Sequence, residues 1–199
     1  MNRILFWLAS FLPCSIISDD ERPYLERYYL FTILGVRFYL HRFVGSDPER
    51  GMHDHPWPWA ASLVLSGSYL EERRGLERHA ITQSMARLFG TEGTTRHHVR
   101  WFNWLLGDNF HRVVLCKGTK RILDDDGNHI GYTHYEKPCW TLFCHRAVHS
   151  KPWGFLRPME GHTAVMWVPH NYPGNGAAGA SGAWWETAPK GRNAERTEL

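Results

Sequence analysis

The sequence predicts an all-β domain. Short runs rich in aromatic and β-branched residues alternate along the chain with turn signals built from Gly, Pro, Asn and Asp. The length of 199 residues is enough for a single domain with a sizeable core. Ten Trp, ten Phe and eight Tyr provide the bulky side chains that suit the interior of a β-barrel.

The N-terminal segment predicts a short amphipathic helix. Apolar residues between Ile4 and Leu12 recur at helical spacing, and Pro13 ends the pattern. The run is far shorter than the ~20 residues of a membrane span, so no membrane partner is expected. A secretory signal sequence is the alternative, because Arg3 precedes the run, although the residues around Pro13 make an unconvincing cleavage site. Residues 1–26 are interpreted as an N-terminal helical arm.

Strands are expected to follow in order. The runs 27–33 and 36–44 predict two strands joined by a tight turn at Leu34-Gly35. Residues 45–51 carry turn chemistry and lead into the next strand. The Asp-Gly step at 126–127 predicts a hairpin turn. Further strand-like runs lie at 60–65, 79–89, 109–115, 139–145, 153–155 and 164–168.

His53 and His55 are the first candidate metal ligands. On an extended strand, residues two apart project to the same side, about 6.5–7 Å apart along the chain, so both imidazoles aim at one point. Asp54 then faces the other side. Two neutral imidazoles placed in this way can chelate one divalent ion at about 2.0–2.1 Å each. The competing interpretation is a pair of surface-loop histidines bonded to the backbone.

A third ligand must come from elsewhere in the chain. His111 is the best candidate, because it lies in the apolar run 109–115 that predicts a strand. His98 is the reserve ligand, although a surface position on a basic strand is the simpler interpretation. Glu71 or Glu72 could supply a carboxylate, although such a pair is more often the solvated end of a strand.

Trp57 is the candidate catalytic residue beyond the metal ligands. It continues the alternation that places His53 and His55 on one face, so it is expected to form a wall of the pocket. Pro56 and Pro58 could break that alternation, because proline removes a backbone donor from a strand.

The segment from His53 to Gly67 resembles the first motif of the cupin superfamily. That motif has His-x-His, a Glu five residues after the second His and a Gly seven residues further on. Gly67 keeps the register, but Ala60 stands at the Glu position. Three histidines without a carboxylate occur in some cupins, including thiol dioxygenases.

The second cupin motif ends in a His, and His111 fits that position. Leu106 and Asp108 stand where the motif usually has Pro and Gly. Segments between Tyr39 and Phe155 also resemble an uncharacterised group of cupin-like proteins from phages and bacteria that carries the His-Asp-His-Pro-Trp motif. The resemblance implies a cupin-type double-stranded β-helix, or jelly-roll barrel, with a metal in its mouth. It does not imply a particular reaction.

The C-terminal part predicts a flexible tail after a barrel that spans 27–170. Small residues dominate 174–182, and the chain is polar and charged after Pro189. Trp184 and Trp185 could still anchor the tail, 171–199, against the barrel.

Charge and cysteine content constrain the partners and the compartment. The net charge is +3, from 23 basic and 20 acidic residues with no dominant basic block, so no nucleic-acid partner is expected. The four cysteines form no C-x-x-C pair, which predicts reduced thiols in a cytoplasmic protein. Open sheet edges invite pairing, so a homodimer through the N-terminal strands is expected.

Two functions remain open. A metal held by three imidazoles leaves positions for water, dioxygen or a small-molecule substrate. The first hypothesis is a cupin-like metalloenzyme that acts on an unknown small molecule, with a mononuclear non-haem iron oxygenase preferred and Fe²⁺ preferred over Zn²⁺, Ni²⁺ or Mn²⁺. The second is a non-catalytic barrel that binds a ligand or assembles with a partner, because fold alone does not decide function. Side chains that plug the barrel mouth would favour the second hypothesis.

Overall fold

A computed structural model describes residues 1–49, 51–74, 94–158, 165–170 and 183–199 of the chain. The predicted strand at 79–89 lies outside these described residues. The described helical segments are α1 (Asn2–Ala9), α2 (Trp184–Thr187) and a 3₁₀ turn, Gly191–Asn193. The strands are β1 (Cys14–Asp19), β2 (Arg22–Ile33), β3 (Val36–Phe43), β4 (Met52–His53), β5 (Trp59–Ser66), β6 (Tyr69–Arg74), β7 (Thr94–Val99), β8 (Phe102–Leu106), β9 (Phe110–Leu115), β10 (Lys117–Leu123), β11 (His129–Glu136), β12 (Cys139–Arg146), β13 (Gly154–Pro158) and β14 (Val165–Pro169).

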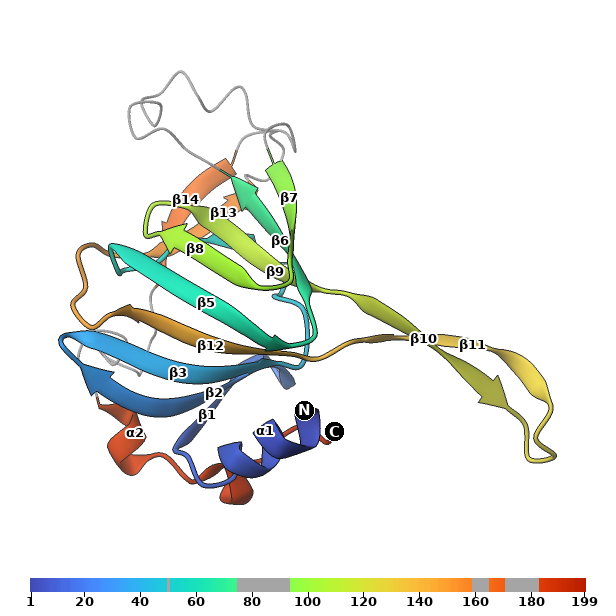
Figure 1. The fold of residues 1–199 in the computed structure, drawn as a ribbon. Helices are drawn as coiled ribbons and strands as arrows, with labels where there is room; N and C mark the ends of the chain where they lie inside the picture. Colours follow the sequence, from blue (N-terminus) through green and yellow to red (C-terminus); the bar gives the residue numbers. More distant parts are fainter. Residues whose placement is uncertain (50, 75–93, 159–164, 171–182) are drawn as a thin grey trace.

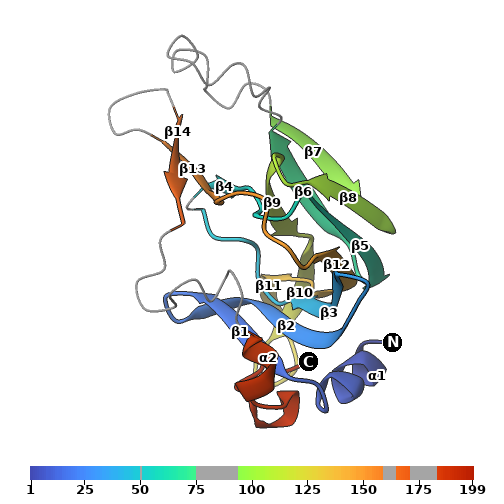
Figure 2. The same cartoon turned by 90° about the vertical axis from the view of Figure 1, so that its left-hand side faces the viewer.

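Two antiparallel sheets form the body of the protein (Figures 1 and 2). Sheet one has the strand order β1-β2-β3-β12-β5-β8, and sheet two has the order β14-β13-β4-β9-β6-β7. Within them, β3-β12-β5-β8 and β4-β9-β6-β7 have the strand order of a jelly roll, in which the chain passes back and forth between two sheets. The predicted all-β, double-stranded β-helix is confirmed, and the short N-terminal helix is present as α1.

The turn between β2 and β3 lies at Leu34 and Gly35, as the sequence predicts. Both residues have positive φ angles, 48° and 69°, which suits a two-residue hairpin turn whose twist matches the flanking strands. The N-terminal arm is helical only over Asn2–Ala9, and residues 14–19 and 22–26 belong to β1 and β2. Among the described residues, none of the helices has the length and apolar character needed to cross a bilayer.

The outer surface of sheet one carries one of the two cores. Leu5 and Ala9 of α1 pack against Tyr28, Leu40 and Trp140 of the sheet, and all five are buried. The second core lies between the sheets and contains Val64, Tyr69, Val99, Val113, Leu115 and Cys139. Strand β12 supplies Trp140 to the outer core and Cys139 to the inner one, because neighbouring residues of a strand face opposite sides.

A buried ion pair ties the C-terminal segment to the outer surface of sheet one. Arg42 of β3 contacts Glu26 of β2, and both side chains are fully buried. Arg42 also donates to the carbonyl oxygens of Thr197 and Glu198 at 2.5 and 2.8 Å, and Glu26 accepts the Thr197 N–H at 2.8 Å. The stacking of Trp185 on Tyr29, with ring centroids 4.1 Å apart, adds an aromatic contact. The described part of the predicted tail is therefore packed on the barrel at these points.

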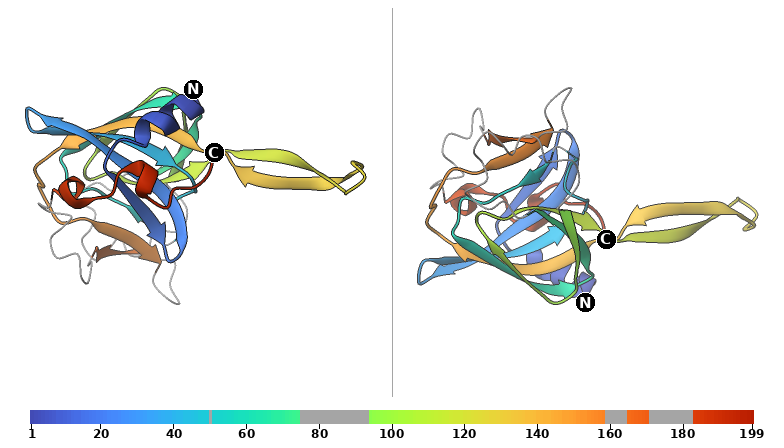
Figure 3. Two further views of the ribbon diagram at one scale, coloured as in Figure 1. Left: turned by 90° about the horizontal axis from the view of Figure 1, so that it is seen from below. Right: turned by 90° about the horizontal axis from the view of Figure 1, so that it is seen from above.

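A two-stranded arm, β10 and β11, projects away from both sheets (Figures 1 and 3). The predicted turn lies at its tip, where the Asp124 carboxylate accepts the backbone N–H groups of Asp126 and Asn128. Asp124 thus acts as a turn residue there, as the sequence predicts.

Candidate metal centre

His53 and His55 occupy the start of the stretch that crosses between the sheets. The strand is shorter than the sequence suggests, because only Met52 and His53 pair with neighbours, and His55 lies just beyond β4. Gly51, directly before β4, allows the chain to pass close to the backbone of Leu156. Its φ is 113°, and a Cβ atom there would stand 2.0 Å from the Leu156 carbonyl oxygen, so only glycine fits.

Asp54 fixes this stretch from the opposite side. Its buried carboxylate accepts the Gly154 N–H at 2.6 Å and contacts the Lys151 ammonium at 2.5 Å. Its own N–H donates to the Gly154 carbonyl, and the His55 N–H donates to the Gly107 carbonyl at 3.2 Å. These bonds hold the backbone while the two histidines face the interior, as the predicted alternation requires.

The structure brings His53, His55 and His111 together. One ring nitrogen of each lies within 4.8 Å of the others. His53 pairs directly with His111 across β4 and β9, and their ring centroids are 4.7 Å apart. The Nε2 atoms of His55 and His111 are 2.8 Å apart. His53 and His55 are half-buried, whereas His111 is buried, so the cluster has one side nearer to solvent.

Glu71 of β6 lies behind His111. Its Oε1 atom is 2.8 Å from the His111 Nδ1 atom, and the side chain is fully buried. Asn103 donates to the same carboxylate at 2.9 Å, and Arg73 contacts its other oxygen. Burial alone would raise the pKa of Glu71, but hydrogen bonding by His111 and the charge of Arg73 outweigh it and lower that pKa. The carboxylate therefore stays ionised.

This contact fixes the tautomer of His111. An ionised carboxylate only accepts hydrogen bonds, so the network assigns the proton of His111 to Nδ1 and leaves the Nε2 lone pair toward the other two rings. Carboxylates that hold a metal-binding histidine in this way orient the ring and raise its basicity. Glu71 thus acts on the cluster through His111 and is not one of the three converging groups.

The other candidate ligands lie elsewhere. Glu72 faces the opposite side of β6, where Arg96 and Arg112 contact its carboxylate. His98 is exposed and shares hydrogen bonds with the Ser68 hydroxyl and the Arg100 guanidinium. Neither residue reaches the three-histidine cluster, because both side chains leave their strands on the outward face.

Trp57 lies beside the cluster. Its ring stacks on His55 with centroids 4.9 Å apart and on His145 of β12 with centroids 3.7 Å apart. Trp57 therefore lies on the same side of the chain as His55, as the alternation predicts. It also links the cluster to a second pair of histidines that sequence reasoning missed.

That second pair is His41 of β3 and His145. His41 stacks on Phe143 at 4.5 Å and His145 on Tyr39 at 5.4 Å, and both imidazoles are buried. Burial lowers the pKa of His145 to about 3 and that of His41 well below the ordinary value, so both rings are neutral. The cross-strand register that stacks these rings is not visible in local sequence.

The residues of the cluster fit a divalent transition metal. Three imidazole nitrogens bound to one ion at about 2.0–2.1 Å would lie roughly 3.3 Å apart. That value falls between the 2.8 Å that separates the Nε2 atoms of His55 and His111 and the 4.8 Å within which all three nitrogens lie. Burial lowers the pKa of His55 well below its ordinary value, and His111 and His53 lower it further. Neutral imidazoles are the form that binds metals.

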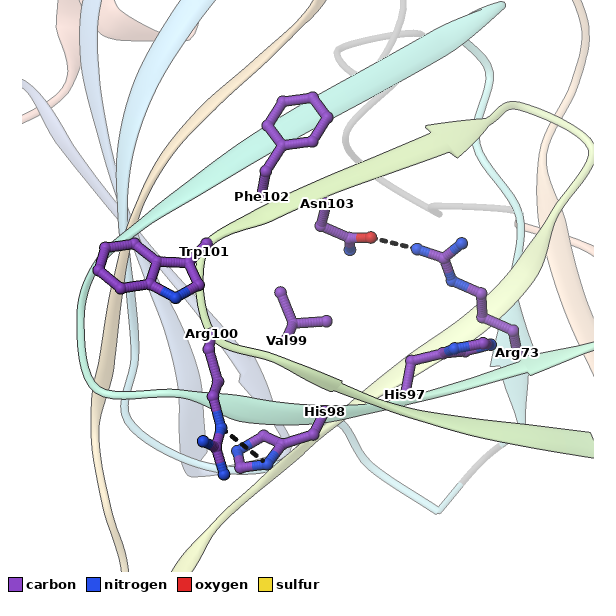
Figure 4. A pocket seen from close by; sticks show the side chains of 8 residues that line it. All are labelled: Arg73, His97, His98, Val99, Arg100, Trp101, Phe102 and Asn103. Carbon is purple, nitrogen blue, oxygen red and sulfur yellow. Dashed lines mark hydrogen bonds between the residues drawn. The ribbon is translucent and has the colours of Figure 1, made fainter.

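A surface pocket of about 400 Å³ lies between β7 and β8 (Figure 4). Arg73 and Asn103, which hold Glu71, line one side of it, and His97 lies next to Arg73. The hydrogen-bond network behind His111 therefore reaches the protein surface here. The three clustered histidines do not line this pocket.

Comparison with known proteins gives only distant similarities. No family model and no curated protein sequence matches the chain. Similar solved structures include iron(II) HppE with an alternative substrate, at 9% identity and a TM-score of 0.40, covering 68% of this chain and 55% of that one. The dimethylsulfoniopropionate (DMSP) lyase DddQ from Ruegeria pomeroyi has 11% identity and a TM-score of 0.36, covering 73% and 51%.

Oxalate oxidase in complex with glycolate has 13% identity and a TM-score of 0.34, covering 57% of this chain and 42% of that one. The chain thus spans about half of the length of these proteins. The function is argued below from the chain's own residues.

Proposed function

We propose that this protein is a cupin-type metalloenzyme that binds one divalent transition metal through His53, His55 and His111. The observation that carries the proposal is the convergence of three imidazole nitrogens within 4.8 Å, one of them oriented by a buried carboxylate. A metal site needs both the ligands and the group that orients them. Histidines that only fill a core have no reason to converge in this way.

Iron(II) is the metal that we favour, and the reaction we favour is an oxygenation of a small molecule. A metal held by three imidazoles on one side keeps open positions at which dioxygen or a substrate can bind and be activated. The half-buried edges of His53 and His55 leave that side accessible, and the Trp57 ring borders it through its contact with His55. Four free cysteines support a reducing, cytoplasmic compartment.

Elemental analysis tests the proposal directly. Protein purified without added metal is expected to contain about one transition metal per chain, with iron the most abundant after anaerobic purification. Zinc, nickel or manganese at the same stoichiometry would support the three-histidine metal site but would argue for a different class of reaction. A folded protein that neither retains nor takes up metal, even after incubation with iron(II), contradicts the proposal.

A non-catalytic binding barrel is the second candidate. The observation in its favour is the aromatic filling of the interior, where Trp57, Phe143 and Tyr39 stack on neighbouring imidazoles. Rings packed in this way leave little room for a substrate beside the cluster. Metal content separates the two functions, because a binding barrel does not require the ion.

A further inference from the structure

The outer surface of sheet one has a covered half and an uncovered half. Helix α1 and its cluster cover β2, β3 and the ends of β12 and β5, up to Leu65. Beyond that point, β5 and β8 carry four exposed apolar side chains on their outward faces. Leu63 is 42% exposed, Phe102 62%, Trp104 45% and Leu106 54%. We call these four residues, together with Trp59, the β5–β8 surface.

The strand register makes this surface continuous. Trp59 pairs with Leu106, and Leu63 pairs with Phe102, across the two strands. The Trp59 ring stacks on Trp104, with centroids 5.0 Å apart. In Figure 4, the side chains of Phe102 and Asn103 leave β8 on opposite sides. β8 thus alternates strictly between a buried face and an exposed apolar face, as a strand covered on both sides would.

The apolar area that these five side chains expose is large for a surface that faces only water. Partly exposed side chains of this size each present on the order of 100 Å², so the five present about 500 Å² of contiguous apolar area. That is near the upper end for the largest patch on a typical monomer. The β5–β8 surface therefore has the character of an interface.

We propose that the β5–β8 surface packs against the same surface of a second copy of this chain. Two such surfaces bury about 1,000 Å² in all, which reaches the lower limit of a specific interface. None of the five side chains carries a charge, so two copies meet without like-charge repulsion. A two-fold axis near Trp104 would place each aromatic pair over the other, with the sheets about 10 Å apart.

The opposite edge of sheet one is less suited to this role. The first residue of β1, Cys14, donates its N–H to the Pro189 carbonyl at 2.8 Å, and Pro13 forms a bridge with Lys190. The C-terminal segment thus pairs with the chain where β1 begins. For this reason we place the dimer contact at β8 and not at the N-terminal strands that the sequence suggested.

Light scattering during size-exclusion chromatography tests the inference on the full chain. Wild-type protein at micromolar concentration is expected to show about twice the chain mass of 23.2 kDa. Trp104→Glu should show the monomer mass, because each interface would bury two unpaired carboxylates, and its dimer dissociation constant should rise at least about 30-fold. Leu106→Glu should act in the same direction.

Trp7→Glu is the matched control. Trp7 of α1 is 60% exposed and belongs to another apolar stripe, so this variant should remain a dimer. Circular dichroism of each variant separates a lost interface from a lost fold. A monomeric wild type overturns the inference and assigns the surface to a different partner. A dimer that Trp7→Glu dissociates while Trp104→Glu does not also overturns it. Neither result bears on metal content, which tests the proposed function separately.

Discussion

Two groups of histidines share the interior of the barrel, and their surroundings differ. His53, His55 and His111 turn ring nitrogens toward one point, and a carboxylate supports the buried member. His41 and His145 instead lie flat against Phe143, Tyr39 and Trp57. The residue type is the same, so the neighbours decide the role. Histidines whose nitrogen lone pairs converge beside a carboxylate can bind a metal. Histidines that stack on aromatic rings form part of the packed core.

The contrast also appears in hydrogen bonding. The Nδ1 atom of His111 has the Glu71 carboxylate as its partner, while the buried Nε2 atom of His41 has no hydrogen-bond partner among the described residues. His145 donates from Nδ1 to the Arg146 carbonyl at 2.6 Å. The stacked pair thus lacks an acidic partner that could raise the basicity of its rings.

The largest effect is expected from removing ligands. His53→Ala, His55→Ala and His111→Ala should each lose most of the bound metal, because two imidazoles hold a divalent ion far more weakly than three. His145→Gln serves as the control and should keep wild-type stoichiometry. Inductively coupled plasma mass spectrometry measures the metal content of the three alanine variants and of the control. Wild-type metal content in all three alanine variants would remove the distinction between the two histidine groups.

Glu71 should have the next largest effect. Glu71→Gln keeps the shape but removes the charge that supports His111, so metal affinity should fall about 10- to 100-fold. Competition with a chromophoric chelator measures the affinity. The neighbouring Glu72→Gln removes an outward carboxylate and should leave the affinity unchanged. Equal losses of metal affinity in both variants would show a general effect of charge and would contradict a specific role of Glu71 in orienting His111.

The stacked pair should respond to pH. The folded-state pKa of His145 is lowered to about 3 and that of His41 is also lowered, so the unfolded state binds more protons below the ordinary imidazole pKa. The free energy of unfolding should therefore be highest above about pH 6.5. Below that pH it should decrease by up to about 1.4 kcal/mol per pH unit for each ring. Urea unfolding at pH 7 and pH 5 measures this loss in metal-free protein.

His145→Gln sharpens that measurement, because it removes one of the two titrating rings. The difference in free energy of unfolding between pH 7 and pH 5 should be smaller in this variant than in the wild type. An identical difference would mean that His145 is not held neutral by burial.

The smallest effect is expected at His41. In the part of the chain that the structure describes, its buried Nε2 atom has no hydrogen-bond partner, which costs free energy in the folded state. His41→Leu removes that cost and fills a similar volume, so the free energy of unfolding should change by less than about 1 kcal/mol, or rise. Thermal unfolding checks the change, and metal content should not alter. A loss of several kcal/mol would indicate that His41 has a polar partner in solution.

The sequence was informative where chemistry depends on local spacing. The alternation of His53, Asp54 and His55 predicted two converging rings and one opposed carboxylate, and the apolar run around His111 placed that residue on a strand. The turn at Leu34-Gly35 and the order of the first strands also followed from local patterns.

Features that depend on pairing between distant strands could not be predicted. Glu71 was open as a ligand, but its place behind His111 follows from the register of β6 with β9. The stacking of His41 and His145 follows in the same way from the register of β3 with β12. The sequence marked only the turn of the arm formed by β10 and β11, because nothing local shows that a hairpin leaves the sheets.

The buried guanidinium of Arg42 has a consequence for synthesis on the ribosome. Two of its acceptors are the carbonyl oxygens of Thr197 and Glu198, some 155 positions downstream. A nascent chain that has already paired β2 with β3 would hold this cation against Trp140 and Phe6, with Glu26 as its anion, until Thr197 and Glu198 emerge. Variants that lack residues 197 and 198 should therefore mature slowly, which release of the nascent chain followed by limited proteolysis can measure.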